Sequence, residues 1–259
     1  MENKLVKAIR RHRWDVSPKR AMGIQAELRQ HWIGEDRFSK IRTVAGLDAA
    51  FVLTGSQALR KSATHWSTLR AANQAIGCVV SYRYPEMMEI ERAFAVLPLQ
   101  FPYVPGLLSF REIPVLLAAL FKLRDIPDLL FCDGQGIAHP RRMGLATHLG
   151  IVLDRPTIGC AKSRLIGTHL EPGKKQGNWS PLIDARAGDK RIGAVLRTRR
   201  GVRPIYVSQG HRISLPTAIR FSLSVTDTLR IPLPTREADR FAAEIKGKFA
   251  NGQLSEKWI

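Results

Sequence analysis

The sequence predicts a single α/β domain in which helices flank a mixed central β-sheet. Its 259 residues, 44% of them hydrophobic, suffice for one sizeable core. Three strand-like runs at residues 43–53, 75–82 and 88–98 follow one another, the last two joined by a short turn, so the sheet begins antiparallel. Two later apolar runs, 128–132 and 156–160, are separated by a helical pattern, which is typical of an α/β sheet.

The chain opens with a basic, helix-prone segment over residues 1–42, and residues 43–259 form the predicted domain. An amphipathic stretch within this segment contains Ile24, Leu28 and Trp32. The lysines and arginines of the segment form either a solvated helical face or contacts to phosphates.

Asp48 lies in the middle of the first predicted strand. A carboxylate in an apolar strand is costly unless it is paired or bound to metal, so Asp48 is either the partner of a buried cation or a ligand. Residues 56–73 show no clear periodicity and predict a long loop before the next strand.

A stiff loop follows the third strand, because two prolines bracket an aromatic residue. The loop consists of Pro102, Tyr103, Val104 and Pro105. Tyr103 either packs under a turn or acts as a rigid wedge or stacking platform for bases. Residues 107–123 then predict a largely buried helix, on which Glu112 would face the sheet.

The stretch at residues 127–167 contains the largest concentration of chemically active side chains. Asp133 ends a buried strand and is followed by glycines, a placement typical of function rather than packing in an α/β sheet. Pro140 predicts the first turn of a helix, and Lys162 follows the next strand. The predicted helix carries Arg141, Arg142 and His148. These groups together predict an anion-handling site.

The C-terminal part adds further strands and two helices that cover the sheet. Residues 171–180 predict a surface loop, 191–203 include a strand, and 205–208 form another. The helices are predicted at residues 215–229 and 235–248. The segment before the last strand contains four arginines, Arg197, Arg199, Arg200 and Arg203. They contact the phosphate backbone or form a solvated face.

The charge of the chain is unusual for a small soluble domain. Against 41 Lys and Arg there are 22 Asp and Glu, which makes the net charge +19. The excess favours a polyanionic partner, above all nucleic acid, over the alternative that the charge serves solubility.

The cysteines and the hydropathy pattern indicate the compartment. Three cysteines sit in apolar runs without CxxC spacing, so we expect buried thiols, a reducing environment and no zinc site. No apolar leader or bilayer-length stretch is present, which predicts a soluble, cytoplasmic protein without a membrane partner.

Three acids come from a first strand, a following helix and a later strand end. This chain order lets Asp48, Glu112 and Asp133 converge over the sheet. Oxygen ligands without nitrogen or sulfur partners suit Mg²⁺ or Mn²⁺, and such ions activate water for phosphodiester hydrolysis. With the basic charge, the acids favour a nuclease over a binding module.

Six blocks of sequence are more specific than the acids alone. They are VAGLDAAF, FPYVPGLLSFREIPVLLAA, PDLLFCDGQGIAHPRRMGLATHLG, PTIGCAKSRLIG, RPIYVSQGHRISLPTAI and IPLPTREAD. In these blocks and in their order the chain resembles the endonuclease V family, nucleases that act on deaminated purines. The resemblance implies a ribonuclease H-like fold and a monomer that acts in DNA repair.

The resemblance also implies the roles of individual residues. It makes Asp48, Glu112 and Asp133 ligands of Mg²⁺, for which Mn²⁺ can substitute. It makes Lys162 and His211 the remaining catalytic residues. The role of His211 stays open between orienting or deprotonating water and protonating the leaving group. Taken without the resemblance, Lys162 is equally a solvated loop lysine and His211 a structural histidine.

The implied substrate is nucleic acid that contains inosine. Cleavage at the second phosphodiester bond 3′ to the lesion would leave a 3′-hydroxyl and a 5′-phosphate. Tyr103 becomes the wedge, and the pocket for the extruded hypoxanthine comprises Gly106, Leu108, Gly136, His139, Gly144 and Leu145. Fixed main-chain groups in that pocket would reject adenine, whose donors and acceptors are reversed. Two alternatives remain open, an endoribonuclease for inosine in RNA and a lesion or junction binder that does not cleave.

Overall fold

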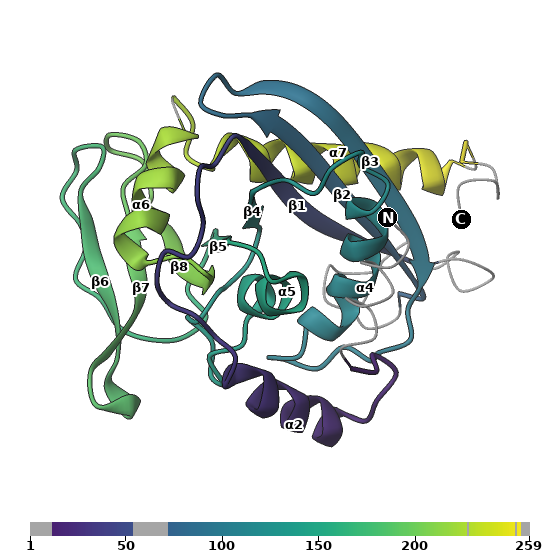
Figure 1. Ribbon diagram of the computed structural model, residues 1–259, viewed down its shortest axis with the longest axis horizontal. Coiled ribbons are helices and arrows are strands. Elements are labelled where there is room, and N and C mark those ends of the chain that lie inside the picture. Colours follow the sequence, from purple (N-terminus) through teal and green to yellow (C-terminus); the bar gives the residue numbers. More distant parts are fainter. Residues whose placement is uncertain (1–11, 54–71, 227, 252, 255–259) are drawn as a thin grey trace.

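An eight-stranded mixed sheet forms the centre of the protein, with strand order β3-β2-β1-β4-β5-β8-β7-β6 (Figure 1). The computed structural model describes residues 12–53, 72–226, 228–251 and 253–254. Most of the loop predicted at 56–73 and the first residues of the basic segment lie outside this described part. Within it, no helix is both long enough and apolar enough to span a membrane.

The strands agree with the predicted runs and include one that was not predicted. They are β1 (Thr43–Val52), β2 (Gln74–Arg83), β3 (Met88–Pro98), β4 (Leu129–Cys132), β5 (Thr157–Ala161), β6 (Trp179–Asp184), β7 (Lys190–Leu196) and β8 (Ile205–His211). The helices are α2 (Pro18–Arg29), α4 (Ser109–Leu120), α5 (Leu145–Leu153), α6 (Leu215–Ser224) and α7 (Leu233–Ala250), with a short 3-10 helix η2 (Ala185–Ala187).

The pairing directions make the sheet mixed. Strands β1, β2 and β3 form the predicted antiparallel meander. Strands β4 and β5 then run parallel to β1, so the C-terminal ends of β4 and β5 point toward the same edge. Strand β8 is antiparallel to β5, and β7 and β6 complete an antiparallel end. The chain therefore reaches one edge of the sheet from several separate strands.

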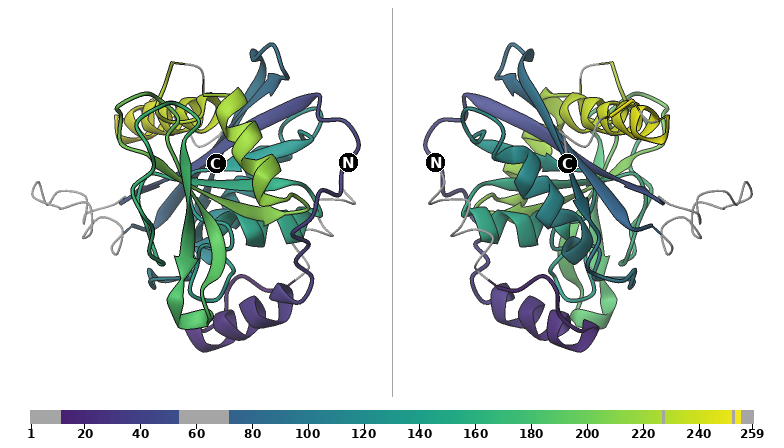
Figure 2. Two further views of the ribbon diagram at one scale, coloured as in Figure 1. Left: turned by 90° about the vertical axis from the view of Figure 1, so that its left-hand side faces the viewer. Right: turned by 90° about the vertical axis from the view of Figure 1, so that its right-hand side faces the viewer.

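Helices cover both faces of the sheet. Apolar side chains of α2, α4 and α5 form one core cluster with alternate residues of β1 and β2. Those of α6 and α7 form a second cluster on the other face. Figures 1 and 2 show α7 crossing β1 and β2 on one side, with α4 and α5 on the other. Successive side chains of a strand point to opposite faces of the sheet, so they pack alternately into the two cores.

Two predictions about local structure were wrong. Pro140 does not begin a helix, because α5 starts only at Leu145, after Gly144. The His139 ring instead accepts the backbone N–H groups of Arg141 and Met143, which holds the segment as a loop. Strand β6 was missed because it contains a proline, Pro181. It lies at the edge of the sheet, where a missing N–H is tolerated.

Candidate active site

The register of the sheet places Asp133 level with Asp48. Cys132 of β4 is paired with Leu47 of β1, and Asp133 donates its backbone N–H to the carbonyl oxygen of Leu47 at 3.3 Å. Lys162 directly follows β5, the parallel neighbour of β4. Three of the predicted site residues therefore meet at one edge of the parallel strands.

Glu112 approaches this edge from the face of the sheet opposite to the one that α7 covers. Asp48 shares the strand parity of Val44 and Val52, which pack into the α6 and α7 core. Glu112 lies in the first turn of α4, whose apolar side chains belong to the other core. The sheet is thus approached by acids from both sides.

A fourth carboxylate, Asp239 of α7, joins the group and was not among the predicted site residues. The ammonium Nζ of Lys162 lies 2.6 Å from Asp133 Oδ2 and 3.2 Å from Asp239 Oδ2. A signal for Asp239 was present in the sequence, because it ends the block IPLPTREAD on a helix predicted to cover the sheet. The Lys162 ammonium therefore links Asp133, at the end of β4, to Asp239 on α7.

The carboxylates repel one another in a poorly solvated place. Burial, followed by the charges of Asp133 and Asp239, raises the pKa of Asp48 to about 7. Burial raises the pKa of Glu112 well above its usual value, and the charges of Asp48 and Asp133 add to this. Burial also raises the pKa of Asp133, although Lys162 opposes the shift. Uptake of protons or of another cation therefore lowers the free energy of the cluster.

Lys162 supplies one positive charge to this cluster. Burial lowers its pKa, but Asp133 and Asp239 outweigh that effect, so the pKa is raised and the ammonium stays charged. Because one lysine faces several carboxylates, the negative charge is only partly compensated.

The donor chemistry of the cluster fits Mg²⁺. Carboxylate oxygens are the ligands that this ion prefers, and a divalent cation would offset the burial and the mutual repulsion that raise their pKa values. Among the described residues, no three His, Cys, Asp or Glu side chains converge closely enough to hold an ion as they stand. In this arrangement the Lys162 ammonium supplies the positive charge next to Asp133 and Asp239.

The loop between β4 and α5 contacts the proline-bracketed loop through His139. A carbonyl oxygen only accepts, so His139 Nε2 donates to Gly106 O, at 3.0 Å. Burial, followed by the charge of Arg141, lowers the pKa of His139 to about 4, so the ring is neutral. Gly106 has a φ of 77°, a left-handed conformation that favours glycine. Two predicted pocket residues are thus held together by one hydrogen bond.

Gln25 of α2 completes this junction and was not among the predicted site residues. Its Nε2 donates to Gly106 O and to Met143 O, both at 3.2 Å. Its Oε1 accepts from Arg141 Nε at 2.5 Å. Gln25 is fully buried, and its helical spacing from the buried Ala21 was the one available signal. The basic N-terminal segment therefore supports the pocket from behind.

The remaining pocket residues are closely packed. Gly144 N donates to Gly136 O at 3.0 Å, and Gly136 N donates to Ser208 Oγ at 2.8 Å. A Cβ on Gly144 would lie 2.3 Å from the carbonyl oxygen of Gln135. Both main-chain groups of Gly136 are therefore used inside the protein, so its role is close approach of the backbone. Leu145 is buried here, and Leu108 is 38% exposed.

The proline-bracketed loop lies at the surface, with Val104 packed against the core. Pro102 and Pro105 are exposed, while Tyr103 and Val104 are half-buried. A turn closes the loop, in which Leu107 N donates to Val104 O at 3.0 Å. This arrangement fits an exposed stiff loop and leaves the wedge role of Tyr103 a prediction.

His211 does not join the carboxylates. It is paired with Thr157 at the start of β5, whereas Lys162 follows Ala161 at its end, roughly 15 Å away along the strand. The His211 ring is buried and contacts Asp154 Oδ1 at 3.4 Å. This register separates His211 from Lys162, because an antiparallel strand ends at the opposite edge. The catalytic role of His211 stays a prediction.

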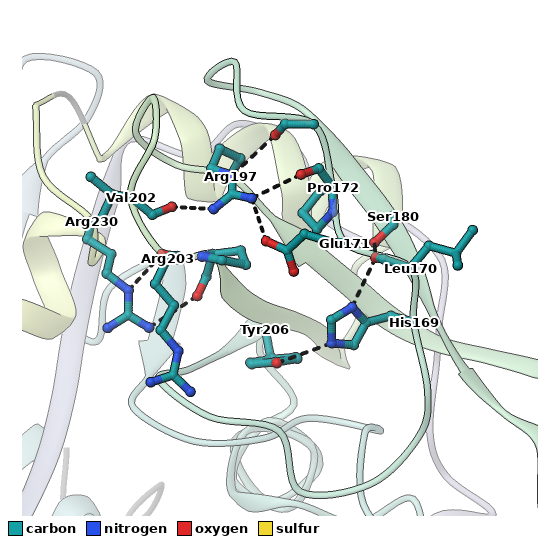
Figure 3. Close-up of polar contacts among 12 residues, drawn as sticks. His169, Leu170, Glu171, Pro172, Ser180, Arg197, Val202, Arg203, Tyr206 and Arg230 are labelled. Atoms are coloured by element: carbon teal, nitrogen blue, oxygen red, sulfur yellow. Dashed lines mark hydrogen bonds and ion pairs between the residues drawn. The ribbon is translucent and has the colours of Figure 1, made fainter.

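Three of the arginines predicted to bind phosphate have partners inside the protein. Arg141 donates to Gln25 and Gly106, and Arg142 forms an ion pair with Asp184. Arg197 is 5% exposed. Its guanidinium contacts Glu171 and the carbonyl oxygens of Pro172, Gly173 and Val202 (Figure 3). Burial and these internal contacts argue against Arg197 as a phosphate-binding residue. Arg199 and Arg200 are exposed and remain predicted phosphate contacts.

Known proteins resemble this chain over most of its length. The sequence model of the endonuclease V family matches residues 26–240. An endonuclease V of Nostoc sp. is 48% identical over 90% of this chain and 96% of its own length. One from Roseiflexus sp. is 45% identical over 89% of this chain and 94% of its own.

Solved structures show the same fold. The endonuclease V of Streptomyces avermitilis has a TM-score of 0.79 at 36% identity and covers 92% of this chain and 96% of its own. That of Ciona intestinalis, in complex with DNA containing an inosine followed by a ribo-adenosine, has a TM-score of 0.74 at 28% identity and covers 90% of this chain and 100% of its own. The predicted ribonuclease H-like fold is confirmed. The family match, the relatives and the shared fold establish that this chain belongs to the endonuclease V family, nucleases that hydrolyse phosphodiester bonds.

Proposed function

We propose that the protein is a Mg²⁺-dependent endonuclease that recognises hypoxanthine in DNA, as a step of DNA repair. It hydrolyses the second phosphodiester bond 3′ to the lesion and leaves 3′-hydroxyl and 5′-phosphate ends. The observation that carries this proposal is the contact of Lys162 with Asp133 and Asp239 beside two further buried acids. The inosine-containing DNA bound to the Ciona intestinalis relative and the net charge of +19 support the substrate class.

Asp48, Glu112 and Asp133 are the residues proposed to hold the metal. When bound, Mg²⁺, or Mn²⁺ in its place, polarises the phosphoryl group and lowers the pKa of the attacking water. Lys162 belongs to the same cluster and carries a positive charge at the edge of the sheet. Its ammonium donates to the scissile phosphate and stabilises the charge that develops there.

The proposed recognition site is the junction of the proline-bracketed loop with the loop before α5. Hypoxanthine presents an O6 acceptor and an N1–H donor where adenine presents the reverse. The hydrogen bonds of His139, Gln25 and Arg141 to Gly106 hold the pocket wall rigid. A rigid wall cannot exchange donors for acceptors, so adenine would leave polar groups unpaired. Tyr103 would fill the gap left by the extruded base.

The test is cleavage of an end-labelled duplex that contains one inosine. With Mg²⁺ we expect a nick at the second phosphodiester bond 3′ to the lesion, and no nick with EDTA or with the Asp48→Ala variant. Matched strands of DNA and RNA are compared in the same assay. Binding of the lesion without cleavage under every condition would overturn the enzyme, and preferential cleavage of RNA would overturn the DNA substrate.

A further inference from the structure

Arg230 was not among the predicted site residues, and it lies directly beside Lys162. It also contacts Arg203, one of the four arginines predicted to contact phosphate or to form a solvated face. Arg230, in the segment before α7, donates from Nε to Arg203 O at 2.9 Å. Its Nη2 donates to Lys162 O at 3.0 Å and to Pro204 O at 3.1 Å. Figure 3 shows Arg230 beside Arg203, whose carbonyl oxygen accepts from Arg230 Nε. One guanidinium thus connects the end of β5 with the residues that precede β8. Within the described part of the chain its Nη1 group has no hydrogen-bond partner.

Arg203 and Arg230 have no carboxylate partner among the described residues. Arg203 is exposed, and its side chain makes no ion pair there, in contrast to the neighbouring Arg197 with its partner Glu171. Burial lowers the pKa of Arg230, and the positive charge of Arg203 lowers it further. Two neighbouring guanidinium groups repel each other when no anion lies between them. An anionic ligand bound between them would offset this repulsion.

We infer that Arg203 and Arg230 form a phosphate clamp that binds a backbone phosphate next to the scissile one. This inference rests on the proposed function and names a subsite for its substrate. Guanidinium groups match phosphate oxygens in geometry and charge. The bond of Arg230 to the carbonyl oxygen of Lys162 places the clamp next to the residue whose ammonium is proposed to contact the scissile phosphate. Arg230 is in addition a positioning residue for Lys162, because it holds that residue's carbonyl.

The bonds of Arg230 explain why arginine is needed at this position. Its three contacts use Nε and Nη2, which form one edge of the planar group. The Nη1 side then faces away from these carbonyls. Lysine has a single point of charge and cannot bind the main chain with one edge and a phosphate with the other.

The test combines charge removal in the protein with charge removal in the DNA. Arg203→Gln and Arg230→Gln are assayed for binding in EDTA to an inosine duplex in which single phosphates near the scissile bond are replaced by neutral methylphosphonates. Arg37→Gln is the matched control, because Arg37 is exposed and lies near Arg212, beyond His211 at the far edge of the sheet. We expect one methylphosphonate to weaken wild-type binding on the order of tenfold. Each clamp variant should bind unmodified DNA more weakly than wild type by a similar factor. On the duplex with that methylphosphonate, the variant should bind as tightly as wild type does.

Cleavage separates the positioning effect of Arg230 from the clamp. Arg230→Gln should lower kcat as well as affinity, whereas Arg203→Gln should act mainly on affinity. In a Lys162→Ala background Arg230→Gln should lower kcat no further, and Arg230→Lys should restore affinity only in part. Circular dichroism and the unfolding midpoint verify that each variant is folded.

The outcomes distinguish the clamp from the proposed function. If wild-type protein cuts inosine DNA but the clamp variants lose equal affinity on every duplex, or none, the clamp is overturned. If wild-type protein does not cut inosine DNA at all, the proposed function fails instead. Tight binding of an acidic peptide that DNA does not displace would also overturn the clamp.

Discussion

Asp48 shows at the scale of one residue how this site opposes folding. It lies within the central sheet, and burial with nearby acids raises its pKa to about 7. Its ionised form is therefore unfavourable in the folded protein until a cation compensates it. Such a cost is expected where a side chain serves chemistry rather than packing.

We expect Asp48→Asn to stabilise the metal-free protein in a pH-dependent way. The folded pKa is above the usual value of 3.8, so the stability that the protonated acid contributes is full below that value and is lost as the pH rises through about 7. The advantage of the variant should be near zero at about pH 4 and on the order of 2–4 kcal/mol at about pH 8. Urea unfolding in EDTA measures it, with the exposed Asp125→Asn as control. Equal advantages at both pH values would contradict the raised pKa.

The same variant should abolish cleavage of inosine DNA. Loss of one proposed metal ligand removes the chemistry although stability rises, which a purely structural acid would not do. Steady-state cleavage with Mg²⁺ measures the loss. Retained cleavage by Asp48→Asn would exclude Asp48 from the metal site.

His139 should stay neutral well below the usual range of histidine. Its folded pKa of about 4 lies below 6.5, so the stability contributed by the neutral ring is present above 6.5 and is lost as the pH falls through about 4. Ring nitrogen NMR should show the Nε2–H tautomer, with Nδ1 as acceptor, down to about pH 5. Titration of the His139 ring near 6.5 would contradict the buried hydrogen bonds.

At the scale of elements, the loop between β4 and α5 depends on close backbone approach. Gly144→Ala would bring a Cβ to 2.3 Å from Gln135 O and 2.5 Å from Gly136 O. We expect a loss of about 1–3 kcal/mol in stability and weaker cleavage, because both contacts are main chain and cannot move aside. In Gly247→Ala, the control, nothing lies within 4 Å of the new Cβ on helix α7, and stability should rise by up to about 1 kcal/mol. Equal stability of both variants would show that the backbone of the loop shifts at little cost to admit the new Cβ.

Helix α2 should affect recognition through Gln25. Gln25→Ala removes the amide that bonds Gly106, Met143 and Arg141, and leaves these buried groups with fewer partners. A loss of about 2 kcal/mol in stability and a raised KM for inosine DNA are expected. The exposed Gln30→Ala at the end of α2 is the matched control. An unchanged KM in Gln25→Ala would separate α2 from the pocket.

The whole molecule is stabilised by two cores that share one sheet. The buried free thiols Cys78, Cys132 and Cys160 lie on β2, β4 and β5. Burial raises their pKa values, that of Cys160 to about 12. A thiol reagent at about pH 8 should therefore react with them only as fast as the sheet opens. Rapid reaction of one thiol in the native protein would show that the sheet opens locally.

Much of the fold was predictable because its signals are local. Runs of apolar residues and the turn before Met88 predicted the antiparallel meander, and the pattern after Leu107 predicted α4 to within a few residues. Strand β6 was missed because Pro181 is tolerated only at a sheet edge, and tertiary structure decides which strand lies there. The loop after Pro140 was mispredicted because the His139 ring accepts the N–H groups of Arg141 and Met143, a local alternative to a helix.

The sequence alone determined the family, the α/β class, the basic character of the chain and three of the four clustered acids, Asp48, Glu112 and Asp133. These are encoded in contiguous blocks and in composition, which need no three-dimensional information. Tertiary structure alone decided which side chains meet. It brought Asp239 and Gln25 to the site, placed His211 at the far edge and buried Arg197. The physical reason is that strand direction, register and helix docking bring together residues that are far apart along the chain, and no local pattern encodes these contacts.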